Sequence, residues 1–334
     1  MVFYGKMLEY IRKLPDEIEE GLNFPVPEVN FNKIDSIIFT GMGGSAIAGD
    51  LVKTILSKEG CIKFETVRDY TLPSYVDENT LVIAASYSGN TEETLSTAKD
   101  AIRRKSILVA LTSGGKLEEL AKREDIPLIK IPSGLPPRAA LGWLFTPLLR
   151  LFEPLEVAMK QIESLKKLPE YLRELRDKME DINSLARSLA DKFYLRIPVI
   201  YSSSFLLPVA TRWQTQINEN SKAFAHIAPL PEMNHNEISG IKNPSERIEI
   251  LWLVFLRDED DNERIKIRMK HTANILRDYV MGITFVDSEG SNLLERIFYL
   301  IFLGDYISLY LAQNYGEDPV AIPRIDELKR RLSG

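Results

Sequence analysis

The stretch TLVIAASYSGNTEETLSTAKDAIRRK, residues 80–105, passes from an unbroken apolar run through a polar turn into a charged segment with helical periodicity. The same layout precedes it in SIIFTGMGGSAIAGDLVKTIL, residues 36–56, and follows it in SILVALTSGGKLEELAKRE, residues 106–124. Short apolar runs without alternation are typical of strands that are buried on both faces. Strands that alternate with helices in this way form parallel sheets between helices. The three stretches therefore predict an α/β fold.

The second half of the chain begins a similar series. RIPVIYSSS, residues 196–204, predicts a strand that ends in a serine-rich turn, and a helical segment follows at 208–225. Further strands are predicted at 248–256 and 281–287. We therefore predict two αβα sandwich domains, each with a mainly parallel sheet between helices. The expected division is an N-terminal helix at 1–23, a first domain at 24–152, a helical connector at 153–190 and a second domain with a C-terminal helix at 191–334.

The composition and net charge exclude some classes of binding partner. The chain has 334 residues, and 42 Lys and Arg stand against 48 Asp and Glu, which gives a formal net charge of -6 at pH 7. This balance excludes a broad basic surface for nucleic acid. An anionic ligand must be held by local dipoles, because the field of the whole protein opposes it.

The cysteine and histidine content argues against a metal site. Cys61 is the only cysteine, which excludes an internal disulfide and a cysteine-based zinc cluster and indicates a reducing compartment. His226, His235 and His271 do not have the spacing of metal ligands. The N-terminal residues lack the apolar core of a targeting signal, and no apolar run approaches the length of a membrane span. We expect a cytoplasmic protein without a metal and without a membrane partner.

The first polar turn, Gly41–Ala46, follows a predicted strand and opens a predicted helix. It matches the G-x-G-x-x-A pattern of dinucleotide-binding proteins, in which Glu65 or Asp69 on the next strand would bind the ribose. It also fits a phosphate-binding turn, and it fits a tight turn whose glycines serve only packing. This motif alone does not choose among the three.

The second turn, Ser86–Thr91, places the three serine and threonine hydroxyls and several backbone N–H groups at the start of a helix predicted to begin at Glu92. Such a helix start suits a phosphate monoester, because its N–H groups are unsatisfied and its dipole end is positive. Ordinary capping by Thr91 would need only one hydroxyl. The third turn, Thr112–Gly115, is similar but requires no ligand. Turns after parallel strands gather at one sheet edge, so a phosphate pocket is favoured over a dinucleotide cleft.

Five motifs together carry a family resemblance: GMGGSAIAGD at 41–50, SYSGNTEET at 86–94, PSGLPPRAALG at 132–142, NENSKAFA at 218–225 and PEMNHNEISG at 231–240. They resemble the bifunctional phosphoglucose/phosphomannose isomerases of the sugar isomerase (SIS) superfamily. The likeness extends to the LKRRL segment near the C-terminus. It implies two SIS-type domains, and it implies isomerisation of glucose 6-phosphate and mannose 6-phosphate with fructose 6-phosphate through an enediol, without a cofactor.

The resemblance also implies roles for individual residues. The phosphate would be held by Gly44, Ser45, Ser86, Ser88 and Thr91. Arg138 would lie over the C1–C2 region of the sugar, and Glu219 would be the base that moves a proton between C1 and C2. Lys329 would help to open the sugar ring. His235 would assist ring opening from the partner subunit of a homodimer.

Apart from the resemblance, the local sequence supports some of these roles better than others. Pro136-Pro137 stiffens the approach to Arg138 and would pre-position its guanidinium. Glu219 also fits a solvated residue near a helix end, and His235 also fits an exposed loop histidine. In the last helix, the spacing of Ile325, Leu328 and Leu332 predicts the inner face, with Lys329 at its border.

Other functions remain open from the sequence. One alternative is a different SIS-family isomerase that acts on an amino sugar phosphate. Another is a regulator that binds a sugar phosphate without catalysis. Such regulators carry a helix-turn-helix module, for which the residues before the first predicted strand are too few. A nicotinamide-dependent dehydrogenase is the third.

Overall fold

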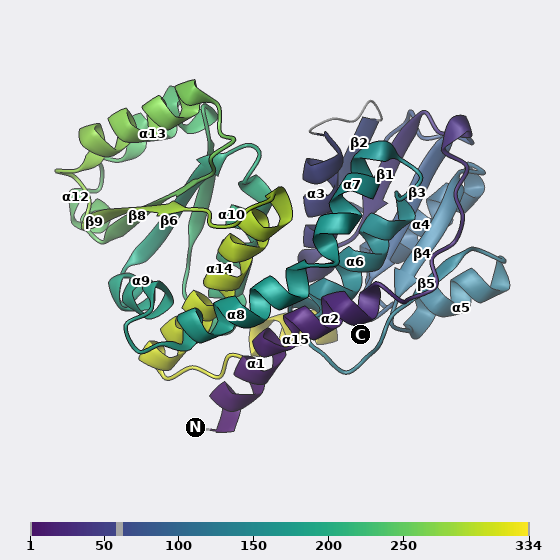
Figure 1. Ribbon diagram of the computed structural model, residues 1–334, viewed down its shortest axis with the longest axis horizontal. Helices are drawn as coiled ribbons and strands as arrows, with labels where there is room; N and C mark the ends of the chain where they lie inside the picture. The colour runs from purple at the N-terminus through teal and green to yellow at the C-terminus, as the bar shows by residue number, and fades with distance from the viewer. Residues whose placement is uncertain (1, 58–62, 333–334) are drawn as a thin grey trace. The chain divides into compact units, whose positions relative to one another are not determined.

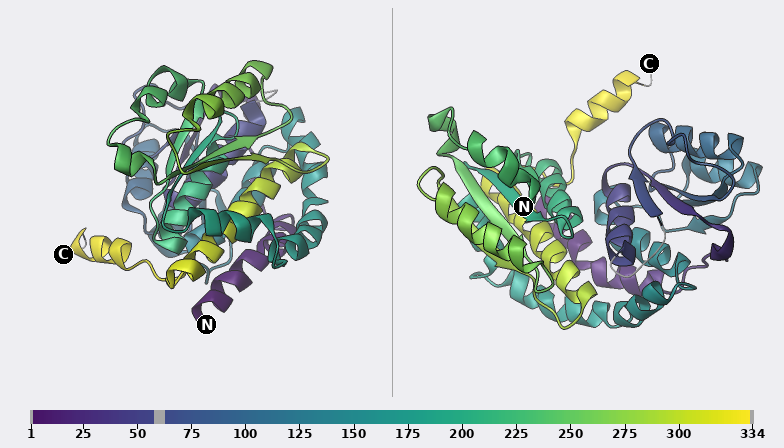
Figure 2. Two further views of the ribbon diagram at one scale, coloured as in Figure 1. Left: turned by 90° about the vertical axis from the view of Figure 1, so that its left-hand side faces the viewer. Right: turned by 90° about the horizontal axis from the view of Figure 1, so that it is seen from above.

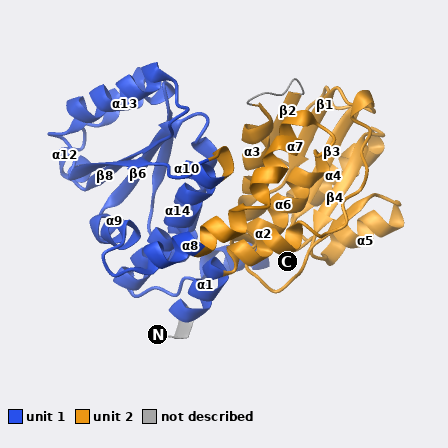
Figure 3. Ribbon diagram, viewed as in Figure 1, with its two compact units in different colours: residues 1–12, 174–291, 295–334 blue, residues 13–173, 292–294 orange. Residues whose placement is uncertain are grey.

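The computed structural model describes residues 2–57 and 63–332, so Cys61 lies outside the described residues. The chain forms two compact units, which Figure 3 colours separately. Unit 1 comprises Met1–Arg12, Glu174–Ser291 and Glu295–Gly334, and unit 2 comprises Lys13–Arg173 and Asn292–Leu294. Each unit contains one parallel sheet with helices packed against it (Figure 1). The predicted α/β class is confirmed, whereas the domain boundaries given above stay a prediction.

Unit 2 has a five-stranded sheet in the order β2-β1-β3-β4-β5, and all neighbouring strands are parallel. Its strands are β1 (Ser36–Thr40), β2 (Lys63–Val67), β3 (Thr80–Ser86), β4 (Ile107–Thr112) and β5 (Leu128–Lys130). Its helices are α2 (Leu14–Gly21), η1 (Phe31–Lys33), α3 (Gly43–Ser57), α4 (Glu92–Arg103), α5 (Gly115–Arg123), η2 (Pro137–Ala139), α6 (Leu141–Leu151) and α7 (Glu156–Leu165). Helix α8 (Leu168–Glu180) passes from unit 2 into unit 1.

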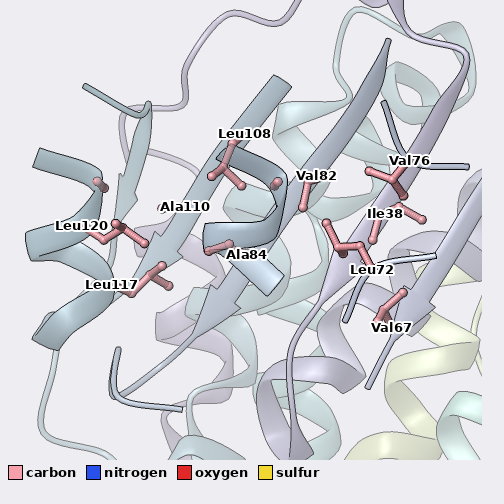
Figure 4. Close-up of a cluster of buried hydrophobic side chains, with 13 residues drawn as sticks. Ile38, Val67, Leu72, Val76, Val82, Ala84, Leu108, Ala110, Leu117 and Leu120 are labelled. Atoms are coloured by element: carbon pink, nitrogen blue, oxygen red, sulfur yellow. The ribbon is translucent and has the colours of Figure 1, made fainter. Parts of the chain in front are cut away.

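The core of unit 2 shows why the apolar runs form central strands. Val82 and Ala84 of β3 point to the same face as Leu108 and Ala110 of β4, because strand side chains alternate between faces. Figure 4 shows these side chains directed toward the helices, which contribute Leu117 and other apolar groups. The intervening residues of β3 are also buried, so β3 is covered on both sides. This burial fixes the strand register and with it the positions of the turns.

Unit 1 has a four-stranded parallel sheet in the order β7-β6-β8-β9. Its strands are β6 (Ile197–Ser203), β7 (His226–Leu230), β8 (Leu251–Arg257) and β9 (Gly282–Asp287). Its helices are α1 (Val2–Arg12), α9 (Leu185–Phe193), α10 (Leu207–Ser221), η3 (Glu232–His235), α11 (Glu237–Gly240), α12 (Ser245–Ile248), α13 (Glu263–Leu276), α14 (Leu293–Tyr315) and α15 (Pro323–Leu332). In the described part of the chain, no helix combines the length and apolarity that crossing a bilayer requires.

Helix α15 differs from the sequence expectation. Ile325, Leu328 and Leu332 were expected to form a buried inner face, but they are 39%, 58% and 61% exposed. No residue of α15 is buried, and both views in Figure 2 show α15 extending away from the rest of unit 1. Helical spacing identifies an apolar stripe, but it does not determine whether the same chain covers that stripe. Lys329 is likewise exposed.

Candidate active site

The turn between β3 and α4 contains most of the predicted phosphate ligands. Ser86 closes β3, and its hydroxyl oxygen accepts a hydrogen bond from the Gly89 N–H at 3.1 Å. The hydroxyl oxygens of Ser86 and Thr91 are 2.8 Å apart. Thr91 occupies the N-cap position of α4 but makes no side-chain capping bond there. Ordinary capping therefore does not account for the Thr91 hydroxyl.

The third turn, Thr112–Gly115, supports the second one. The Ser113 hydroxyl donates to the Tyr87 carbonyl at 2.6 Å, and the Ser113 N–H donates to the same oxygen at 3.1 Å. Gly89 has a φ of +69°, and a Cβ there would lie 1.7 Å from the Gly114 carbonyl oxygen. Only glycine fits this approach. The polar groups of the third turn thus hold the second turn in place, which is the structural role that its sequence allowed.

The first turn is joined to the second through Ser45 and Tyr87. Ser45 is buried near the start of α3, and its hydroxyl oxygen accepts from the Tyr87 N–H at 3.1 Å. A hydroxyl that accepts one bond retains its own hydrogen to donate. The Tyr87 hydroxyl in turn accepts from the Leu135 N–H at 3.0 Å. Tyr87 therefore links the first turn to the loop that leads to Arg138.

The backbone of Arg138 lies close to the first turn. A Cβ on Gly44 would lie 2.9 Å from the Arg138 Cα and 2.9 Å from the Arg138 nitrogen, so this approach requires glycine. The Arg138 side chain, on η2, is 3% exposed. The structure thus gathers Gly44, Ser45, Ser86, Thr91 and Arg138 on one side of unit 2, at the carboxyl ends of β1 and β3. Ser88 belongs to the same turn and is exposed.

Tyr87 was not among the residues singled out from the sequence. An aromatic residue between two serines at a strand end was the available signal, since a buried tyrosine generally places its hydroxyl on a partner. Of the two acids that the dinucleotide alternative offers, one already has a hydrogen-bond partner within the protein. Glu65 accepts a hydrogen bond from the Tyr75 hydroxyl.

The carboxyl edge of the unit 1 sheet carries different chemistry. After β8, the Asp258 carboxylate accepts from the Arg296 Nε at 2.9 Å, and both side chains are buried. Glu259 and Asp260 also pair with Arg296. The serine-rich turn after β6 lies at the same edge, but the carboxylates that follow β8 disfavour a phosphate there, whereas the hydroxyl-bearing turn after β3 in unit 2, Ser86–Thr91, contains no carboxylate. The phosphate-compatible edge is therefore that of unit 2.

The other three predicted residues lie on separate elements of unit 1. Glu219 is half-buried near the C-terminal end of α10, whose next residues are fastened to α14. There the Asn220 amide donates to the Ser308 hydroxyl at 2.9 Å, and the Ser221 hydroxyl donates to the Ser308 carbonyl at 2.6 Å. His235 ends η3 and is exposed. Lys329 is exposed on α15.

Two family models match separate parts of the chain. A family model described as "SIS domain" matches residues 30–133, and one described as "Bacterial phospho-glucose isomerase C-terminal SIS domain" matches residues 182–332. A solved structure of a hypothetical protein from Thermus thermophilus has a TM-score of 0.72 at 18% identity and covers 99% of this chain and 91% of its own, which supports the fold alone.

Two curated relatives match at higher identity. The bifunctional phosphoglucose/phosphomannose isomerase of Caldicellulosiruptor bescii is 43% identical over 98% of this chain and 99% of its own length. The protein of the same name from Aquifex aeolicus is 39% identical over 89% of this chain and 90% of its own. Identity at this level over nearly the whole length confirms the resemblance seen in the motifs. The chain belongs to the bifunctional phosphoglucose/phosphomannose isomerase family.

Proposed function

We propose that this chain interconverts fructose 6-phosphate with glucose 6-phosphate and with mannose 6-phosphate through a shared enediol. The observation that carries the proposal is the Ser86–Thr91 hydroxyl pair at the N-terminus of α4, where the Thr91 side chain does not cap the helix. The names of the relatives supply the substrate class. The chemistry needs one base for the C1–C2 proton and fixed cationic or dipolar groups for the enediolate oxygen.

In this proposal the phosphate binds at the second turn. Ser45, Ser88 and one hydroxyl of the Ser86–Thr91 pair donate hydrogens to it, and Gly44 leaves room beside the Arg138 backbone. The α4 N-terminus adds its backbone N–H groups and the positive end of its dipole. Glu92 in the first helical turn is exposed, and Tyr70 donates to its carboxylate at 3.5 Å. These dipoles bind a dianion in a protein whose net charge is negative.

Proton transfer is assigned to Glu219, with Arg138 beside the reacting carbons. Arg138 is almost fully buried, so its positive charge acts through a medium of low dielectric on the negative charge of the enediolate. Glucose 6-phosphate and mannose 6-phosphate differ only at C2, and both give the same enediol. One base therefore serves both substrates if the bound sugar can rotate about its C2–C3 bond.

Ring opening is assigned to His235 and Lys329. We propose a homodimer in which His235 of the partner subunit reaches the sugar, and a cytoplasmic location. A histidine suits proton exchange with a ring oxygen, because one imidazole nitrogen can donate a proton while the other accepts one. Exposure of His235 within the single chain agrees with use at an interface.

A coupled assay tests the function. Purified protein is given glucose 6-phosphate or mannose 6-phosphate, and fructose 6-phosphate formation is measured, with glucosamine 6-phosphate as a third substrate. We expect turnover of the first two sugars. Turnover of glucosamine 6-phosphate alone would favour the amino sugar alternative, and binding of all three without turnover would favour the regulator.

A further inference from the structure

Glu237, two residues beyond His235, has both carboxylate oxygens engaged by neighbouring strands of unit 1. The Tyr201 hydroxyl, on β6, donates to Oε1 at 2.7 Å. The His226 Nε2, on β7, lies 3.0 Å from Oε2. Tyr201 is fully buried, and its ring packs against Phe255 with centroids 5.2 Å apart. The Glu237 carboxylate is therefore attached to two strands whose own positions are set by the sheet.

The protonation of this group follows from its contacts. Burial opposes the charge on Glu237, but the hydrogen bonds from His226 and Tyr201 outweigh it and hold the pKa of the carboxyl below its ordinary value. The hydrogen bond to Glu237 raises the pKa of His226. Glu237 is thus ionised near neutral pH and serves as an acceptor for its two neighbours. This arrangement suits an anchor rather than a base that must exchange protons with a substrate.

The segment that carries His235 is also fastened on its other side. The Asn234 amide donates to the Thr272 hydroxyl at 2.8 Å and accepts from Arg268 at 3.3 Å, and both partners lie on α13. Met233 is buried in the core of the unit. His235 itself is exposed between these attachments. The backbone on either side of the imidazole is held, and the ring faces outward.

We propose that Glu237, tied to Tyr201 and His226, is a positioning residue that sets the location of His235 for opening the sugar ring. This inference rests on the proposed function. A proton-transfer group loses much of its effect when it is displaced by about 1 Å, so the anchor contributes through geometry. Tyr201 and His226 contribute to the same positioning, because each holds one oxygen of the Glu237 carboxylate.

The test compares a substrate that must open with one that is already open. Fructose 6-phosphate closes its ring through O5, and 5-deoxyfructose 6-phosphate, which lacks O5, stays open. The measured quantity is the ratio of kcat/KM for the first substrate to kcat/KM for the second. Tyr201→Phe keeps the packing and removes the bond to Oε1. We expect this ratio to fall about ten- to hundredfold in Tyr201→Phe. His235→Ala sets the largest fall that displacement of His235 can cause.

Tyr306→Phe is the matched control. Tyr306 is also fully buried in unit 1, and its hydroxyl also donates to a glutamate, Glu180, at 2.7 Å. The two variants lose the same kind of bond, but only Tyr201 contacts Glu237. A Tyr201→Phe ratio equal to that of Tyr306→Phe would overturn the inference. Wild-type protein inactive on both aldose phosphates would instead overturn the proposed function.

Conservative replacement of His226 gives a second readout. His226→Gln retains an N–H donor for Glu237, whereas His226→Ala retains none. We expect His226→Gln to keep the wild-type ratio of the two substrates and His226→Ala to lower it. Equal ratios in these two variants would contradict a role for the hydrogen bond. Thermal unfolding of each variant confirms that folded protein is compared.

Discussion

The side-chain oxygens of Ser86 and Thr91 lie 2.8 Å apart across the turn between β3 and α4, although Thr91 holds the N-cap position of that helix. A capping threonine ordinarily accepts a hydrogen bond from an N–H of its own helix. Here the two hydroxyls pair with each other, which uses one of their two hydrogens and leaves the other to be donated. Phosphate oxygens accept such a hydrogen bond and those of the helix N–H groups. The turn is therefore arranged for an anion.

Loss of one phosphate contact should appear in KM. Ser88→Ala and Thr91→Ala each remove one hydrogen bond to a charged group, worth roughly 1.5–3 kcal/mol, so we expect KM to rise about ten- to hundredfold. The phosphate keeps its charge during the reaction, so kcat should change little. Steady-state kinetics with glucose 6-phosphate measures both constants. Ser96→Ala, on the same helix but bonded to the Tyr70 carbonyl, is the control. A fall in kcat at constant KM would show that these hydroxyls do not bind the phosphate.

The stability of unit 2 should depend on Asp100 and on pH. Asp100 is buried and accepts hydrogen bonds from Arg104 and from the Leu72 N–H. Burial opposes its charge, but these bonds outweigh it and lower the pKa of Asp100 below its ordinary value of 3.8. A lowered pKa gives stability that is present above the unfolded-state value and is lost as the pH falls through the folded-state value.

Asp100→Asn should therefore lower the free energy of unfolding by about 2–4 kcal/mol near pH 7, because it leaves Arg104 without its counter-charge. The difference from wild type should shrink as the pH falls below about 4, where the carboxyl of the unfolded state is protonated first and that of the folded state, with its lowered pKa, follows. Urea unfolding at several pH values measures this. Glu156→Gln, at an exposed pair with Lys160, is the control and should change stability by less than about 1 kcal/mol. A difference that does not vary with pH would contradict the ionic explanation.

Activity should not require a metal. The sequence has one cysteine and no histidines at metal-ligand spacing, and proton transfer through an enediol needs a base and fixed positive groups rather than a metal ion. We expect unchanged kcat with both aldose phosphates after exhaustive dialysis against a chelator. A loss of turnover that a single divalent ion restores would refute this prediction.

The strands that carry the candidate site could be predicted because their apolar runs are continuous. The segments at 36–56, 80–105 and 106–124 each form the expected strand, turn and helix. Strand β7 was missed, because His226–Leu230 contains a proline and too little apolar sequence to mark a strand. Without β7, nothing placed His226 beside the NHNEISG segment.

The sequence analysis also did not predict contacts between residues that are far apart in the chain. Glu237 meets partners 11 and 36 residues away in the sequence, and a periodic pattern carries no information on such pairs. The link from Tyr87 to Leu135 spans 48 residues and was missed for the same reason. The prediction that α15 has a buried inner face was wrong, because the spacing of apolar residues does not determine whether another part of the chain covers them. The close approaches at Gly44 and Gly89 involve the backbones of Arg138 and Gly114, which are also distant in the sequence, and they were not predicted either.

The central claim is that one base serves both aldose substrates, and Glu219→Gln tests it most directly. The change keeps the side-chain shape and removes the proton acceptor. With Glu246→Gln, an exposed glutamate on α12, as the control, kcat is measured with glucose 6-phosphate and with mannose 6-phosphate. We predict that Glu219→Gln lowers kcat by roughly 10²–10⁴ with both sugars, by a similar factor, while sugar phosphate still binds. Loss of one activity with the other spared, or retention of both, would contradict the account.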